Sequence, residues 1–320
     1  WGYGLLKGNK SRAVPGLEKY HGSNIFLTDA LTLEAEAEME KALQEGKPFY
    51  LNMSHYAVHQ PFEADKRYLA HYQNSGKGGQ AEAFATLVEG MDKSLGDLMQ
   101  KLEELGVAEN TLILFLGDNG GDAPLGGAAD YGSSAPLRGQ KGSEYEGGVR
   151  VPFIAAWAKP DANNKFQKKY PIARNAVQLQ QGTVMDLYPT ILSVAGVDTP
   201  KNYTLDGADL KKLLKGKADK KHRDDFLMHF PHGEHRANYF TTYRKGDWKL
   251  IYYYNPDTTG DPSWKLYNLK EDPYEASDLA EKHPDKVSSM IQQMKARLEA
   301  ENALYPENKD GVAYTPVTGI

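Results

Sequence analysis

A group of side chains suited to metal-ion chemistry lies between two apolar segments near the middle of the chain. Asp118 and Asn119 directly follow the apolar segment 111–116, and Arg138 and Lys141 come later in a glycine-rich stretch. Carboxylate and amide oxygens are the hard ligands that Ca²⁺ and Mg²⁺ take in proteins. The pattern therefore indicates a functional loop that contains a candidate divalent-metal site.

The apolar segments on either side predict the strands that would position these side chains. Residues 111–116 and 151–157 are short, mostly apolar and bounded by turn residues, which is typical of buried strands in a parallel sheet. Ligands of open α/β sheets bind where loops leave the carboxyl ends of strands. A tight turn is the alternative for Asp118 and Asn119, but residues 120–134 contain no second strand of the kind a hairpin needs. From its spacing alone, Lys141 could equally be a solvated surface group.

Two motifs in this region resemble a known family. GDNGG at residues 117–121 and PLRGQKGSEYEGGVRVP at residues 136–152 are similar to the second half of the type I (formylglycine-dependent) sulfatases, within the alkaline phosphatase superfamily. The resemblance implies that Asp118 and Asn119 ligate one divalent cation, usually Ca²⁺ with Mg²⁺ as the alternative. It also implies that Lys141 contacts the sulfate group. A sulfate ester builds negative charge on its leaving oxygen, which a metal ion and fixed cations stabilise.

Two histidines follow the short apolar segment 48–54, which predicts another strand. A histidine in such a loop is most often a polar surface residue. The sequence KPFYLNMSHYAVHQPF, however, resembles the sulfatase strand that is followed by a histidine close to a proline. The resemblance implies that His59 contacts the sulfate or the leaving oxygen, whereas His55 matches less well and is assigned to the rim of the site.

The nucleophile of a sulfatase has no clear counterpart in this chain. Ser134 begins an S-x-P-x-R sequence, but Leu137 stands where the family's C/S-x-P-S-R motif has serine, so we do not expect Ser134 to be the nucleophile. Residues 1–54 match neither that motif nor the family's adjacent aspartates. Formylglycine is therefore expected upstream of this chain, which is interpreted as lacking the N-terminal third of a sulfatase. The chain by itself is then expected to be inactive.

The order of the predicted elements gives an α/β fold. Helix patterns over residues 32–46, 80–105 and 183–196 alternate with strand patterns, which predicts a mostly parallel sheet flanked by helices. The resemblance makes this fold alkaline phosphatase-like. We assign residues 1–222 to the remainder of the large sulfatase domain.

Residues 223–320 have a different pattern and predict a small α+β domain. FLMHF, YFTTYR, WKLIYYY and WKLYNL are typical of an antiparallel four-stranded sheet, and residues 285–303 predict an amphipathic helix. This arrangement resembles the sulfatase C-terminal subdomain. The spacing of His229, His232 and His235 allows a zinc cluster, but a strand end followed by proline and glycine is a poor zinc scaffold. We instead expect His232 to contact a sulfated sugar, and the roles of His55 and His235 stay open.

The composition and charge of the chain exclude several classes of partner and of cross-link. A formal net charge of −5 argues against nucleic acid, and the sequence contains no apolar run long enough for a membrane span. The chain has no cysteine, so disulfides and cysteine-bound zinc are excluded. The resemblance implies a periplasmic or secreted bacterial protein.

The resemblance favours a sulfuric ester hydrolase, acting on a small-molecule or oligosaccharide sulfate ester. The first alternative is a phosphodiesterase or phosphonate monoester hydrolase of the same superfamily. Those enzymes usually have a histidine after the strand-end aspartate and often use two metal ions, so Asn119 favours the sulfatase. The second alternative is a noncatalytic protein that binds sulfated glycans.

Overall fold

The computed structural model describes residues 14–125, 134–232, 237–255 and 262–317. The chain divides into two compact units. The first unit comprises Trp1–Ile113, Ala123–Leu125 and Ala156–Lys169, and the second comprises Leu114–Asp122, Gly126–Ala155 and Tyr170–Ile320. The predicted boundary between residues 222 and 223 stays a prediction, although the first strand of the C-terminal sheet begins shortly after it, at Asp225.

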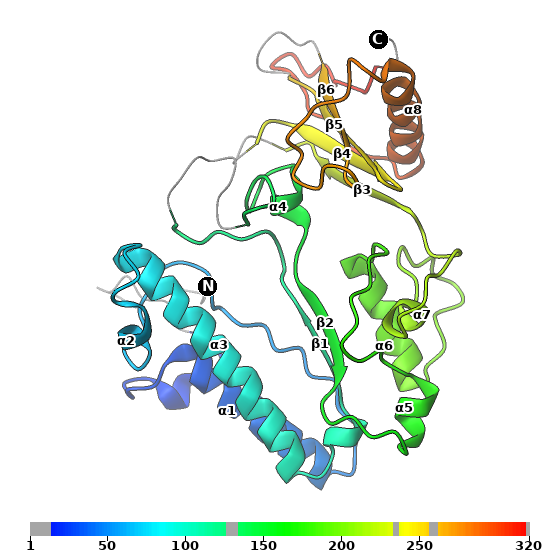
Figure 1. Cartoon of the computed structure of the whole chain (residues 1–320). Helices are drawn as coiled ribbons and strands as arrows, with labels where there is room; N and C mark the ends of the chain where they lie inside the picture. The colour runs from blue at the N-terminus through cyan, green and yellow to red at the C-terminus, as the bar shows by residue number, and fades with distance from the viewer. Residues whose placement is uncertain (1–13, 126–133, 233–236, 256–261, 318–320) are drawn as a thin grey trace. The chain divides into compact units, whose positions relative to one another are not determined.

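The first unit is built around two long helices that lie side by side, α1 (Leu27–Gln44) and α3 (Gly79–Glu104) (Figure 1). Helix α3 was predicted from apolar side chains that recur at helical spacing, and α1 from its helix-forming residues, although α1 begins at Leu27 and not at residue 32. Their core contains Ala35, Met39, Leu98, Leu102 and Ala108. The shorter elements are η1 (Glu18–Tyr20), α2 (Leu69–Tyr72), η2 (Ala108–Asn110) and α5 (Lys165–Lys169).

Residues 48–54 are extended but do not form the predicted strand. Phe49, Leu51 and Met53 pack against the core of the first unit, whereas Tyr50 points away and is 69% exposed. Side chains that alternate between two sides are typical of an extended chain. A strand also needs a hydrogen-bonded neighbour, and in the described part of the chain residues 48–54 belong to no sheet.

Strands β1 (Leu112–Leu116) and β2 (Phe153–Trp157) form a two-stranded sheet. Gly117 N donates to Pro152 O and Ala158 N donates to Thr111 O, so the two strands run antiparallel. The strands were expected to be buried and parallel. Instead β1 is only half-buried and Ile154 of β2 is 61% exposed, because packing partners, not apolar composition, decide burial.

The second unit contains short helices α4 (Glu146–Val149), η4 (Val184–Asp186), α6 (Leu187–Ala195) and α7 (Lys211–Leu214). The turn before α6 is fixed by Asp186, which accepts hydrogen bonds from Thr183 N at 2.7 Å and Ala208 N at 2.8 Å. Asp186 is therefore a buried packing acid. Helix α6 ends at Gly196, whose φ of 71° suits glycine.

The predicted C-terminal meander is confirmed. Strands β3 (Asp225–Phe230), β4 (Phe240–Lys245), β5 (Trp248–Tyr253) and β6 (Ser263–Asn268) pair antiparallel in that order. Helix α8 (Pro284–Ala300) covers one face of this C-terminal sheet (Figure 1). Leu250, Tyr252 and Leu266 from the sheet pack there with α8 residues Val287, Met290, Ile291, Met294 and Leu298.

No helix in the described residues is both long enough and apolar enough to cross a membrane.

Candidate functional site

The predicted metal ligands lie in the turn that follows β1. Gly117 N donates to Pro152 O at 3.2 Å, and the chain then turns away from the sheet. The Asp118 side chain is exposed, whereas Asn119 is partly buried and its Nδ2 donates to Gly120 O at 3.0 Å. This bond directs the amide nitrogen toward the backbone and leaves Oδ1 as the acceptor. Asp118 and Asn119 thus present oxygen atoms from one tight turn.

The turn packs backbone to backbone on a second glycine-rich segment. Gly120 N donates to Gly148 O at 2.9 Å. A Cβ atom at Gly120 would lie 2.0 Å from Gly147 O and 2.6 Å from Gly148 Cα, so no other residue fits there. The glycines of GDNGG and EGGVR therefore allow the two motifs to lie in contact.

The loop of residues 138–148, which we call the lysine loop, brings Lys141 to the same turn. Lys141 N donates to Gly121 O at 3.0 Å, and the lysine is half-buried. Ser134 strengthens the junction, because its Oγ accepts from Gly121 N at 3.0 Å and donates to Gly147 O at 2.7 Å. These bonds give Ser134 a structural role. The structure thus places the backbone of Lys141 against the turn that contains Asp118 and Asn119, and the roles of these three residues stay predictions.

The side-chain oxygens at this turn are of the kind that Ca²⁺ binds, but they are too few for a complete site. Asp118 and Asn119 supply hard oxygens, whereas Ca²⁺ takes about six to eight such ligands. Within the described ranges, no group of three or more histidine, cysteine, aspartate or glutamate side chains is placed to hold a metal ion. The two residues can therefore hold part of a Ca²⁺ coordination sphere and not a whole one.

His59 belongs to the first unit. Its Nδ1 lies 2.8 Å from Gln60 O, and its backbone N donates to Tyr56 O at 2.9 Å, so the loop fixes the ring beside Pro61. The neighbouring His55 is half-buried, and burial lowers the pKa of its imidazole. Its Nδ1 has no hydrogen-bond partner among the described residues. Neither observation assigns a role, so the catalytic role of His59 stays a prediction.

The histidines after β3 differ from each other. His232 is exposed, and its ring lies 4.4 Å from the ring of Phe230, so it is available to a ligand. His229 has a structural role, because both ring nitrogens are hydrogen-bonded. Its Nδ1 lies 2.7 Å from Thr241 Oγ1, and its Nε2 lies 2.5 Å from Leu304 O. His235 falls outside the described residues. Sugar binding by His232 stays a prediction.

Three residues that the sequence analysis did not single out lie beside the lysine loop. Glu146, Lys249 and Glu275 form a buried charged cluster. The signal in the sequence was a lysine inside an apolar strand, WKLIYY, since lysine is rarely buried unless it is paired. Its partners were not predictable, because they lie far away along the chain.

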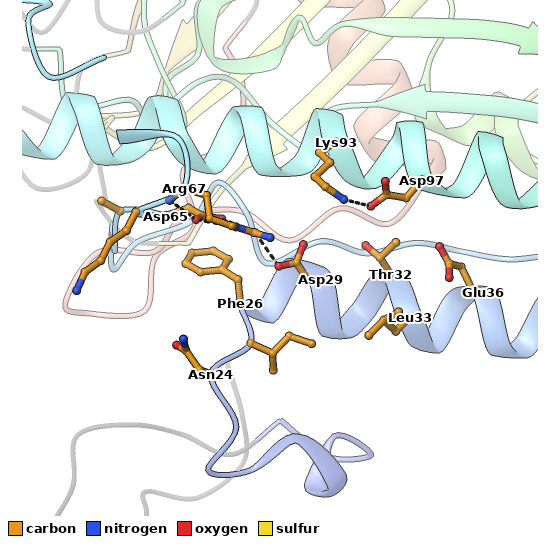
Figure 2. Close-up of a pocket in the computed structure, with 13 residues that line it drawn as sticks. Asn24, Phe26, Asp29, Thr32, Leu33, Glu36, Asp65, Arg67, Lys93 and Asp97 are labelled. Carbon is orange, nitrogen blue, oxygen red and sulfur yellow. Dashed lines mark hydrogen bonds and ion pairs between the residues drawn. The ribbon is translucent and has the colours of Figure 1, made fainter. Parts of the chain in front are cut away.

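The first unit contains a pocket of about 620 Å³ between α1, α3 and residues 64–67 (Figure 2). The Arg67 side chain reaches both Asp29 at 2.6 Å and Asp65 at 2.5 Å, and Lys93 pairs with Asp97. These basic groups are thus neutralised by acids from the same pocket. None of the predicted site residues lines it, so the pocket is not a candidate for the anion site.

Comparisons with known proteins agree with the motifs. The sulfatase family model matches residues 6–197, and the model of the N-sulphoglucosamine sulphohydrolase C-terminal region matches residues 140–303. A sulfatase of Formosa agariphila is 29% identical over 97% of this chain and 56% of its own length. Human N-acetylgalactosamine-6-sulfatase is 31% identical over 68% of this chain and 38% of its own length.

A solved structure has the same fold. The crystal structure of Ps i-CgsB in complex with k-i-k-neocarrahexaose is 25% identical, with a TM-score of 0.67 over 91% of this chain and 56% of that one. The chain thus spans about half the length of the relatives it matches. The family model matches residues 6–197, which is more than half of the chain. The chain belongs to the sulfatase family.

Proposed function

We propose that this chain carries the anion-binding and metal-binding part of a sulfatase that removes sulfate from a carbohydrate. The observation that carries the proposal is the junction between two motifs. The turn with Asp118 and Asn119 is bonded through Gly121 O to the backbone of Lys141, which puts oxygen ligands and a fixed cation in one structure. A sulfate monoester needs both, because its charge must be held in the ground state and stabilised as the ester bond breaks.

Each side chain has a proposed role. Lys141 would hold the sulfate oxygens, and Asp118 and Asn119 would ligate Ca²⁺, with Mg²⁺ as the alternative. The bound ion would supply positive charge beside the sulfate. His59 would supply a proton to the leaving oxygen, for which an imidazole is suited near neutral pH. The formylglycine nucleophile is proposed to come from outside this chain, so the chain alone should not turn over a sulfate ester.

A carbohydrate substrate is proposed from the relatives. One is named for N-acetylgalactosamine 6-sulfate chemistry, and the structure of another holds k-i-k-neocarrahexaose. His232 is exposed at the end of β3 and would contact the sugar at the edge of the site. Export to the periplasm or the medium is part of the same proposal.

The test compares leaving-group chemistry on the full gene product. Initial rates with an aryl sulfate, an aryl phosphate diester and an aryl phosphonate monoester give kcat/KM for each class, and sulfate release from sulfated oligosaccharides identifies natural substrates. We expect the sulfate ester to be preferred, with Lys141→Ala reducing its turnover about a hundredfold or more.

Two other outcomes would replace the proposal. A preference for the phosphate diester or phosphonate would assign the protein to the other branch of the superfamily. Tight binding of sulfated oligosaccharides without turnover of any ester would make it a noncatalytic glycan-binding protein.

A further inference from the structure

The lysine loop covers the face of the C-terminal sheet that is opposite helix α8. Three successive loop residues contact alternate positions of β5. Glu144 accepts a hydrogen bond from the Tyr253 hydroxyl, Tyr145 packs with Ile251, and Glu146 Oε1 lies 3.0 Å from Lys249 Nζ. Alternate residues of a strand point to the same face, so the loop docks on the sheet in one register.

Strand β6 and Arg138 extend this contact. Lys265 Nζ donates to the Tyr145 hydroxyl at 2.9 Å. The Arg138 guanidinium stacks on the same tyrosine ring, with Cζ 4.0 Å from the Tyr145 centroid, and Arg138 Nη1 donates to Glu275 O at 3.0 Å. Both ends of the loop are thus attached to the domain that follows it in the sequence.

A buried lysine between two carboxylates lies at the centre of the contact. Lys249 is 2% exposed, and its Nζ lies 2.8 Å from Glu275 Oε1 as well as 3.0 Å from Glu146 Oε1. Glu275 is fully buried, and its Oε2 accepts from Glu146 N at 2.6 Å. Arg244 Nη1 stands 3.8 Å from Glu146 Oε2 and adds a second positive charge. Burial raises the pKa of Glu275, and the Lys249 ammonium opposes that shift.

Stability alone does not account for such a cluster. Burying three charges has a desolvation cost of several kcal/mol per ion, and apolar side chains of similar size are often neutral or more stable. Apolar contacts such as Tyr145 with Ile251 are non-directional, so they do not determine which loop residue opposes which strand position. The ion pairs and the Glu146 backbone bond are directional and do determine it.

The register set at Glu146 reaches Lys141 through the backbone of the loop. Gly147 N, next to Glu146, donates to Arg138 O at 2.6 Å and closes the loop. A Cβ atom at Gly147 would lie 2.4 Å from Arg138 O, so the two ends of the loop are in direct backbone contact. Lys141 N is bonded to Gly121 O within the turn that carries Asp118 and Asn119. A displacement of Glu146 would therefore move Lys141 relative to the metal-binding turn.

We propose that Lys249 and Glu275 are positioning residues, which hold Glu146 and thereby fix the Lys141 ammonium relative to Asp118 and Asn119. The assignment rests on the proposed function insofar as Lys141 contacts the sulfate ester. The positioning itself is a property of this chain that can be measured without any substrate.

The test uses a variant that removes the charges and keeps the side-chain sizes, Lys249→Met with Glu146→Gln and Glu275→Gln. Because the three charges disappear together, we expect the melting temperature to stay close to that of the wild type. We expect hydrogen–deuterium exchange in peptides covering residues 138–148 to become faster. On the full gene product, kcat for an aryl sulfate should fall between about tenfold and a hundredfold, since small misplacement of a catalytic group has effects of that size.

The matched control is another lysine–carboxylate pair on the same sheet. Lys245 of β4 lies 2.6 Å from Asp224, but their side chains are 43% and 65% exposed, unlike those of the buried cluster. Lys245→Met with Asp224→Asn should leave exchange in the loop and kcat unchanged. Should the triple variant fail to fold, Glu275→Gln alone gives the same comparison, because it is isosteric.

Two results would overturn the positioning role. One is a folded variant in which loop exchange and kcat equal those of the wild type. The other is an equal effect of the Lys245 control. If the wild type instead hydrolyses phosphate esters, the proposed function fails, and the exchange measurement still decides the positioning role.

Discussion

The two sheets of this protein have similar apolar sequences and very different environments. In the C-terminal sheet, Leu250, Ile251 and Leu266 are fully buried, with α8 on one face and the lysine loop on the other. In the β1–β2 sheet, Ile154 is 61% and Phe153 is 40% exposed. The turn with the predicted metal ligands follows β1, yet the loop that presents Lys141 is held by the C-terminal sheet. Within this chain, the small C-terminal domain therefore supports the candidate site.

The largest expected effect is a difference in stability when an apolar side chain of each sheet is truncated to alanine. Leu250→Ala in the 320-residue chain should lower the free energy of unfolding by about 2–5 kcal/mol, because it removes buried methyl groups and leaves a cavity. Ile154→Ala should change it by no more than about 0.5 kcal/mol, as for other exposed positions. Urea unfolding followed by tryptophan fluorescence measures both, since Trp248 and Trp264 lie on β5 and β6. Equal losses would show that the β1–β2 sheet is as well packed as the C-terminal one.

The next effect concerns the glycine contact between the lysine loop and the turn after β1. Gly120→Ala would put a Cβ atom 2.0 Å from Gly147 O and 2.6 Å from Gly148 Cα, so the backbone must move. We expect a loss of about 1–3 kcal/mol in stability, as for other overpacked positions. Gly96→Ala is the control, because it lies in helix α3 with open space around it and should be neutral or stabilising. A neutral Gly120→Ala would contradict the tight contact between the two motifs.

These contacts mark the limit of what could be predicted from the sequence. The strands and helix of the C-terminal domain follow local patterns, alternation in β3–β6 and helical spacing in α8, and were predicted. Asp118, Asn119 and Lys141 were found from motifs. The docking of the lysine loop depends on pairs such as Glu146 and Glu275, which are 129 positions apart, and no local pattern encodes such a pair. The segment 48–54 shows the converse, because its alternation predicted a strand whose hydrogen-bonded neighbour is not in the described structure.

A smaller effect on the free energy of unfolding is expected when the pH is lowered. It arises at His229, at the edge of the C-terminal sheet. Burial lowers the pKa of His229, which connects β3 to Leu304 O. The folded state thus favours the neutral imidazole, and the unfolded histidine takes up a proton first as the pH falls below about 6.5. Stability that is present above that pH should be lost as the pH falls from there through the lowered pKa of the folded state.

The measurement is the free energy of unfolding between pH 7.5 and pH 5, compared for the wild type and His229→Gln. The variant should show a shallower pH dependence, because it has no imidazole to titrate. The exposed His21→Gln is the control and should follow the wild type. A wild-type slope in His229→Gln would assign the pH dependence to other groups.

The smallest effect concerns Ca²⁺ at the end of β1. With two oxygen donors from Asp118 and Asn119, the 320-residue chain should bind Ca²⁺ with a dissociation constant no tighter than about 10⁻⁴ M. Isothermal titration calorimetry measures this, and Asp118→Ala should abolish the remaining heat of binding. Submicromolar affinity would mean that this chain contributes further ligands to the ion.

The central claim, that Lys141 holds the sulfate while His59 serves the leaving oxygen, is tested most directly by kinetics on two aryl sulfates. The full gene product and its Lys141→Ala and His59→Ala variants are compared on one ester with a good leaving group and one with a poor one, with kcat and KM separated. We expect Lys141→Ala to raise KM and lower kcat on both esters. His59→Ala should lower kcat about a hundredfold on the poor leaving group and much less on the good one, which departs without a proton. Equal losses for both variants on both esters would contradict the claim.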